Sequence, residues 1–135
     1  CYIVEGEINR SEYNRILQSI DLIVLPYRPY NFSHKTSNLL SEAIGLGIVP
    51  IAPDNTTMGD VLKQKRIGAV YSPYTAAALA ECLKVSIDRF QELKSLSQLA
   101  AIEWRRNNSP EAFLRNVLNL KNDNDCRSNI PIYSN

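Results

Sequence analysis

The chain has 135 residues, and 15 Lys and Arg residues against 14 Asp and Glu residues give it a formal net charge of +1 at pH 7. With 44% hydrophobic and 21% charged residues, its composition is that of a globular protein. A charge so close to zero excludes a strongly basic nucleic-acid-binding domain and an acidic, solvating tail. We therefore expect one domain, or part of one, with no nucleic acid among its partners.

Few residues of the chain suit metal or nucleophilic chemistry. Cys1, Cys82 and Cys126 are far apart in the sequence and His34 is the single histidine, which argues against a disulfide framework, a zinc site and a Ser-His-Asp hydrolase. We expect no metal and no cofactor. The low cysteine content favours a reducing, cytoplasmic compartment, and no apolar run approaches the roughly 18 residues of a membrane span.

Strand-like and helix-like segments alternate in the first half of the chain. The pattern predicts, in chain order, a strand at 2–5, a helix at 9–20, a strand at 21–26, a loop at 27–35, a helix at 37–46, a strand at 48–52 and a helix at about 58–65. The uninterrupted apolar run at 21–26 is typical of a strand buried on both faces of a parallel sheet. Pro50, in contrast, argues against a central sheet position for the strand at 48–52.

Capping residues predict where several helices begin. Asn9 starts the first helix, and Thr57 with Asp60 caps the helix at 58–65. After a strand at 68–72, Thr75 starts a helical tract at 76–106 that divides into two helices near 88–91. Ser109-Pro110 begins a last helix to about Leu120, and residues 121–135 form a polar tail. Trp104 and Phe113 are expected to form a core between the C-terminal helices.

This alternation predicts an α/β fold with a parallel sheet and helices on both faces. In such sheets ligands bind beyond the C-terminal ends of the strands. The first candidate site is therefore the loop after the strand at 21–26 together with the helix start near Ser37. The loop at 53–57 is the second candidate.

The helix that begins near Ser37 carries groups that can bind a phosphate and a pair of hydroxyls. The backbone amides of Ser37, Asn38 and Leu39 lie at a helix N-terminus, which binds phosphate groups, and Lys35 adds a positive charge. Glu42 is the only carboxylate of this helix and can accept two ribose hydroxyls. From periodicity alone, a solvated or salt-bridged Glu42 is the favoured interpretation.

Five short motifs in a fixed order resemble one enzyme family. They are IVEGEI at 3–8, DLIVLP at 21–26, SNLLSEAIGLGIVPIA at 37–52, GAVYSP at 68–73 and NNSPEAFLRNVL at 107–118. Residues 2 to about 120 thereby resemble the C-terminal nucleotide-sugar-binding domain of the glycosyltransferase group 1 family, retaining enzymes of the glycogen-synthase-like group with the GT-B fold.

The resemblance implies a donor site and a reaction. It implies an incomplete Rossmann-like domain at 1–120 and transfer of a sugar, with retention, from a nucleoside-diphosphate sugar to an acceptor hydroxyl. Glu42 matches the family's ribose-binding glutamate, and the amides of residues 37–39 match those that hold the diphosphate. His34 stands where the family has a glutamate that acts near the donor sugar. A surface-loop histidine is the alternative interpretation of His34.

The resemblance also implies that parts of the family enzyme are missing. The acceptor-binding N-terminal domain and the first two strands of the C-terminal domain have no counterpart here, and the chain begins with Cys1 in strand-like sequence. We interpret the chain as a fragment that is inactive alone. A peripheral membrane association of the full-length protein, through the missing domain, is compatible with this interpretation.

Three other functions deserve comparison with this one. The replacement of the family glutamate by His34 favours a degenerate, non-catalytic module that binds a nucleotide sugar or acts in assembly. A nucleotide-sugar epimerase shares the two-domain architecture. A flavodoxin-like receiver is disfavoured, because it requires an acidic pocket at the strand ends and only Asp54 is placed there.

An unpaired strand edge in such a fragment predicts self-association, because open edges pair with other chains. We expect limited solubility or a homo-oligomer in size-exclusion chromatography over a range of concentrations. A monomer that remains monodisperse at every concentration would contradict this expectation.

Overall fold

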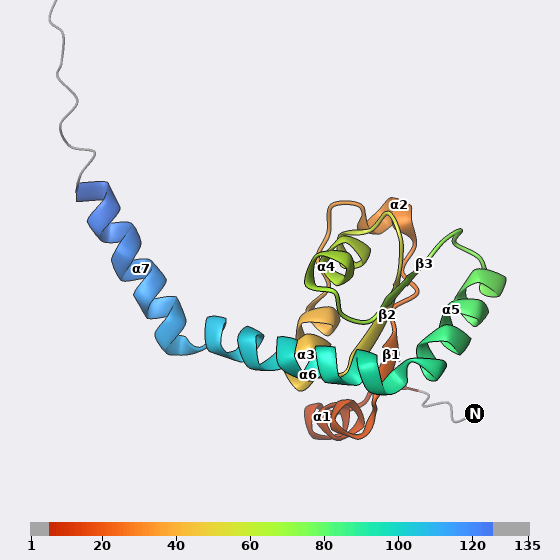
Figure 1. Ribbon diagram of the computed structural model, residues 1–135. Helices are drawn as coiled ribbons and strands as arrows, with labels where there is room; N and C mark the ends of the chain where they lie inside the picture. The colour runs from red at the N-terminus through yellow and green to blue at the C-terminus, as the bar shows by residue number, and fades with distance from the viewer. Residues whose placement is uncertain (1–5, 126–135) are drawn as a thin grey trace, which may run out of the picture. The chain divides into compact units, whose positions relative to one another are not determined.

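The computed structural model describes residues 6–125 as a mixed α/β structure, a small parallel sheet flanked by helices (Figure 1). Its elements are α1 (Arg10–Ser19), β1 (Leu22–Val24), α2 (Pro29–Phe32), α3 (Asn38–Leu46), β2 (Val49–Pro53), α4 (Thr57–Lys65), β3 (Ala69–Tyr71), α5 (Ala76–Asp88), α6 (Phe90–Asn107) and α7 (Pro110–Asp125). The predicted strand at 2–5 lies outside the described residues.

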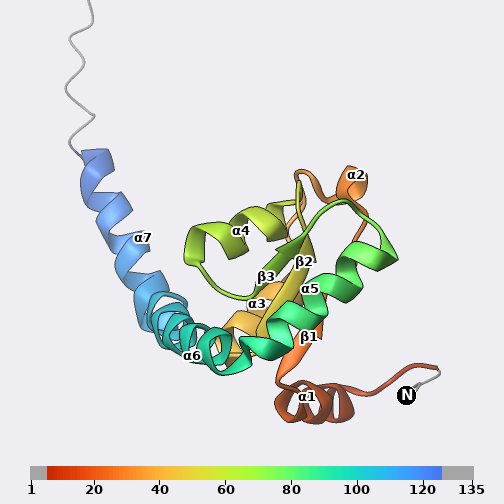
Figure 2. The ribbon, with the colours of Figure 1, turned by 45° about the vertical axis from the view of Figure 1, so that its right-hand side comes forward.

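The three strands are parallel and adjacent in the order β1-β2-β3. Leu22 pairs with Val49 across β1 and β2, and Ile51 pairs with Ala69 across β2 and β3. In Figures 1 and 2, α3 and α4 lie on one face of the sheet and α5 lies on the other. This confirms the predicted parallel sheet with helices on both faces.

The strand that contains Pro50 is the central one, so the prediction that proline would exclude it from that position was wrong. All five residues of β2 are buried. Asp54 donates its amide to Tyr71 of β3, so residues of even number in β2 direct their amides toward β3. Pro50 precedes the first β2–β3 pair, which joins Ile51 and Ala69. Its missing N–H therefore removes no hydrogen bond from the ladder.

The strand predicted to be buried on both faces is instead half-buried along its length. Each residue of β1 has intermediate exposure, and within the described residues β1 pairs only with β2. Leu25, directly after the strand, is 1% exposed. The apolar run is therefore fully buried only at Leu25, near its C-terminal end. Residues Leu22–Val24 of β1 remain partly accessible to solvent.

Side-chain caps start the helices, with one correction to the prediction. Asn9, Thr75 and Ser109 accept hydrogen bonds from the amides of the residues three positions later, as predicted. The cap of α4 is Thr56, whose Oγ1 accepts from the Gly59 amide at 3.0 Å. The assignment to Thr57 was one residue too late, because Thr57 already has helical geometry.

The chain divides into two compact units, Cys1–Ile102 and Glu103–Asn135, with the boundary inside α6. In the second unit α7 continues to Asp125, past the predicted end at Leu120. Phe113 is 68% exposed, so the expected core of Trp104 and Phe113 is absent from the described part of this unit.

We expect Gly68→Ala to lower the free energy of unfolding by about 2–4 kcal/mol. Gly68 has a φ of +61°, and a Cβ there would lie 1.9 Å from the Pro50 carbonyl oxygen. Gly6→Ala is the matched control, because Gly6 also has a positive φ, of +89°, but no atom lies within 4 Å of an added Cβ. Urea unfolding of both variants measures the difference, and equal losses would contradict the predicted clash.

Candidate functional site

Three helices begin at the edge of the sheet where the strands end. α3 follows β1 after the loop that contains α2, α4 follows β2, and α5 follows β3. Hydroxyl groups of Ser37, Thr56 and Thr75 cap these helices. Because helix N-termini carry partial positive charge, this edge favours an anionic ligand. It is the edge at which the sequence predicted the site.

The start of α3 leaves three backbone amides available within the described residues. Ser37 is 8% exposed, and its Oγ accepts a hydrogen bond from the Leu40 amide at 3.3 Å. Asn38 is exposed and Leu39 is half-buried. Among residues 6–125 the amides of Asn38 and Leu39 donate no hydrogen bond to another protein group. The amide of Ser37 likewise donates no hydrogen bond within these residues, so all three predicted diphosphate contacts are unpaired.

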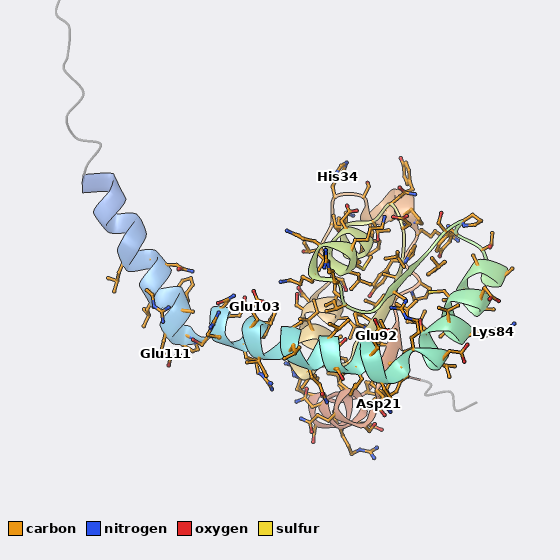
Figure 3. All side chains as sticks on the ribbon, in the orientation of Figure 1. Asp21, His34, Lys84, Glu92, Glu103 and Glu111 are labelled. Carbon is orange, nitrogen blue, oxygen red and sulfur yellow. The ribbon has the colours of Figure 1, made fainter. Side chains whose placement is uncertain are left out.

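His34 and Lys35 lie in the loop before α3, and both are exposed. Figure 3 shows His34 at the end of the first unit where the strands terminate, beside α2. The Thr57 hydroxyl joins this loop to α4, since it is within hydrogen-bond distance of the carbonyl oxygens of Lys35 and of Phe32. The loop predicted at 27–35 is therefore anchored, and it contains the short helix α2, stabilised by the stacked rings of Tyr27 and Phe32.

Glu42 is only partly open to solvent, and its carboxylate accepts a hydrogen bond from the Tyr13 hydroxyl of α1. Glu42 and Tyr13 are both half-buried. The hydrogen bond to the carboxylate raises the pKa of Tyr13 above its usual value. The guanidinium of Arg10 lies 5.9 Å from the centre of the Tyr13 ring.

Sequence reasoning missed this contact between Tyr13 and Glu42. The helical spacing of the first helix places Tyr13 on its apolar face, and its ring does pack against the buried Leu17, Ala43 and Ile48. Its hydroxyl partner, however, lies 29 positions further along the chain. A local pattern indicates that a tyrosine is partly buried, but it does not indicate where the hydroxyl finds its acceptor.

The loop after β2, the second predicted candidate, contains an ion pair. Asp54 accepts hydrogen bonds from the Lys63 ammonium and from the Asn55 amide, the latter at 2.7 Å. These two donors hold the pKa of Asp54 below its usual value. Because Asp54 is already paired, this loop offers less free charge to a ligand than the start of α3.

Two hollows beside β3 do not contain the predicted site residues. Each has a volume of about 510 Å³, and they flank β3, one against α4 and α6 and the other against α5. A smaller hollow of about 190 Å³ lies at the C-terminal edge of the strands, between Pro26, Tyr71 and the start of α5. None of these three hollows is lined by Ser37, Asn38 or Leu39.

No protein-family model, curated protein or solved structure matches the chain. Within the described residues no group of three or more His, Cys, Asp and Glu side chains is arranged to hold a metal ion. None of the helices that the structure describes combines the length and the apolar character needed to cross a membrane.

We expect the Asp54–Lys63 pair to stabilise the fold by about 0.5–1 kcal/mol at neutral pH. The pKa of Asp54 is lowered in the folded state, so this contribution is present above the unfolded pKa of about 3.9 and is lost as the pH falls through the folded value. Asp54→Asn should therefore be less stable than the wild type at pH 7 and equally stable in strong acid.

Urea unfolding across this pH range measures the effect. Asp88→Asn is the control, because Asp88 is an exposed helical aspartate for which no ion pair is found in the described part of the chain. A difference between wild type and Asp54→Asn that persists unchanged in acid would contradict the assignment.

Proposed function

We propose that the chain carries the donor-binding part of a retaining glycosyltransferase, built on a Rossmann-like sheet of the GT-B type. The observation that carries the proposal is the arrangement of groups on α3: three unpaired amides at its start, within the described residues, and the carboxylate of Glu42 on its second turn. Phosphates and ribose hydroxyls are the groups that amides and a carboxylate recognise. The motif resemblance supplies the reaction class.

In this proposal the diphosphate of the sugar nucleotide binds the amides of Ser37, Asn38 and Leu39 at the N-terminus of α3. Ser37 caps the helix, and Lys35 adds a positive charge near the phosphates. As the glycosidic bond to the donor breaks, negative charge develops on the leaving diphosphate, and the helix N-terminus stabilises it electrostatically. No cofactor or metal is required for this role.

Glu42 and His34 have separate roles in the proposal. Glu42 accepts the ribose hydroxyls, because the Tyr13 hydroxyl uses only one of the lone-pair sites of its carboxylate. His34, exposed in the loop before α3, is the group that would act near the donor sugar. The acceptor would bind to a separate N-terminal domain, so the chain alone is expected to bind donor without turnover.

A second candidate is a module that binds a nucleotide sugar without catalysing transfer. His34 differs from the family glutamate in charge and reach, and this difference favours the second candidate. Activity of the full-length protein on any nucleotide sugar would decide between the two. For both candidates we propose a cytoplasmic location, on the basis of the low cysteine content.

We expect Glu42→Ala to weaken binding of a nucleoside diphosphate by about 1–3 kcal/mol, the range for lost hydrogen bonds to a charged group. Titration calorimetry with UDP, GDP and ADP measures the loss. Glu81→Ala is the control, since Glu81 is an exposed carboxylate on α5. Equal affinity of the wild type and Glu42→Ala would remove the ribose role of Glu42.

A further inference from the structure

We propose that Tyr13 is a positioning residue for the ribose-binding carboxylate of Glu42, which adds α1 to the donor site. Its hydroxyl donates a hydrogen bond to Oε2 of Glu42. Among the described residues Oε1 of Glu42 accepts no hydrogen bond, so it remains available for a ribose hydroxyl. The inference rests on the proposed function, because it concerns how Glu42 is held for the ribose.

The ring of Tyr13 is itself held on two sides. It packs against the cluster of Leu17, Ala43 and Ile48, which are 5%, 0% and 2% exposed. The guanidinium of Arg10 approaches its centre to 5.9 Å. Because the ring is confined, the hydroxyl presents a fixed donor to α3 rather than a mobile surface group.

A fixed donor has a direct consequence for Glu42. An unrestrained glutamate on a helix samples several rotamers, and ordering such a side chain on binding costs conformational entropy. The Tyr13 hydroxyl imposes that order before a ligand arrives, so a ribose meets a carboxylate already oriented. A tyrosine hydroxyl is protonated at neutral pH, as a donor must be, and the hydrogen bond to Glu42 raises the pKa of Tyr13 further.

Ala43 and Glu42 are neighbours on α3, and both contact α1. Ala43 packs in the apolar cluster with Leu17, and Glu42 accepts the hydrogen bond from Tyr13. Ala43 is fully buried against α1, so the turn of α3 that carries Glu42 is pressed toward the helix that carries Tyr13. A shift of α1 would therefore move the hydroxyl and the carboxylate together. This packing is why we assign the hydrogen bond a positioning role and not that of an incidental surface contact.

The test measures how well the chain distinguishes ribose from 2′-deoxyribose. Titration calorimetry with UDP, GDP and ADP first identifies which of them binds, and its 2′-deoxy counterpart is then titrated. Tyr13→Phe keeps the packed ring and removes the hydroxyl. We expect it to lower the preference for the ribonucleotide by about threefold to tenfold, the loss of one hydrogen bond.

Two further variants separate positioning from a general loss of structure. Tyr74→Phe removes a tyrosine hydroxyl that donates to the Pro26 carbonyl at 2.8 Å, and it should leave the ribose preference unchanged. In a Glu42→Gln background, Tyr13→Phe should lower the preference no further, because Tyr13 acts through that carboxylate.

The outcomes distinguish this inference from the proposed function. If none of the three nucleoside diphosphates binds the wild type, the proposed function fails and the inference fails with it. If one binds and Tyr13→Phe keeps the full ribose preference, only the inference is overturned. An equal loss in Tyr74→Phe, or a further loss in the Glu42→Gln background, would overturn it as well.

Discussion

The parallel pairing of β1, β2 and β3 is the constraint on which the site depends. Strands that run in the same direction must be joined by crossovers, so each following helix begins at the edge where its strand ends. α3, α4 and α5 therefore present their N-termini at one edge of the first unit. The burial of the whole of β2 holds this arrangement together, because both neighbouring strands and the packed helices depend on it.

The hydrogen bond between Tyr13 and Glu42 connects the candidate site on α3 to the helix α1. A carboxylate on a helix surface is ordinarily free to move, but here α1 supplies a hydroxyl that restrains it. The apolar cluster that contains Leu17 and Ala43 holds α1 against α3, close enough for the Tyr13 hydroxyl to bind the Glu42 carboxylate. The proposed orientation of Glu42 on α3 thus depends on how α1 packs against α3.

Local sequence patterns predicted most of the described elements, because caps and hydrophobic periodicity act over a few residues. Asn9, Thr75 and Ser109 cap the helices that they were expected to cap. The errors about the strands arose where the neighbouring residues were distant in the sequence. Pro50 is compatible with a central strand only because the turn that ends at Gly68 lies beside it, where no ladder donor is needed. The assignment of the α4 cap to Thr57 rather than Thr56 was a local error of one position.

The sequence by itself determined that the chain alternates strands and helices and that α3 begins at Ser37 with Glu42 on its second turn, since these depend on local spacing. Only the tertiary structure decided which strand is central, how far β1 is buried, and that Tyr13 reaches Glu42. The physical reason is that such contacts join residues far apart in the chain. Their energies depend on how the helices pack on the sheet, which no local pattern contains.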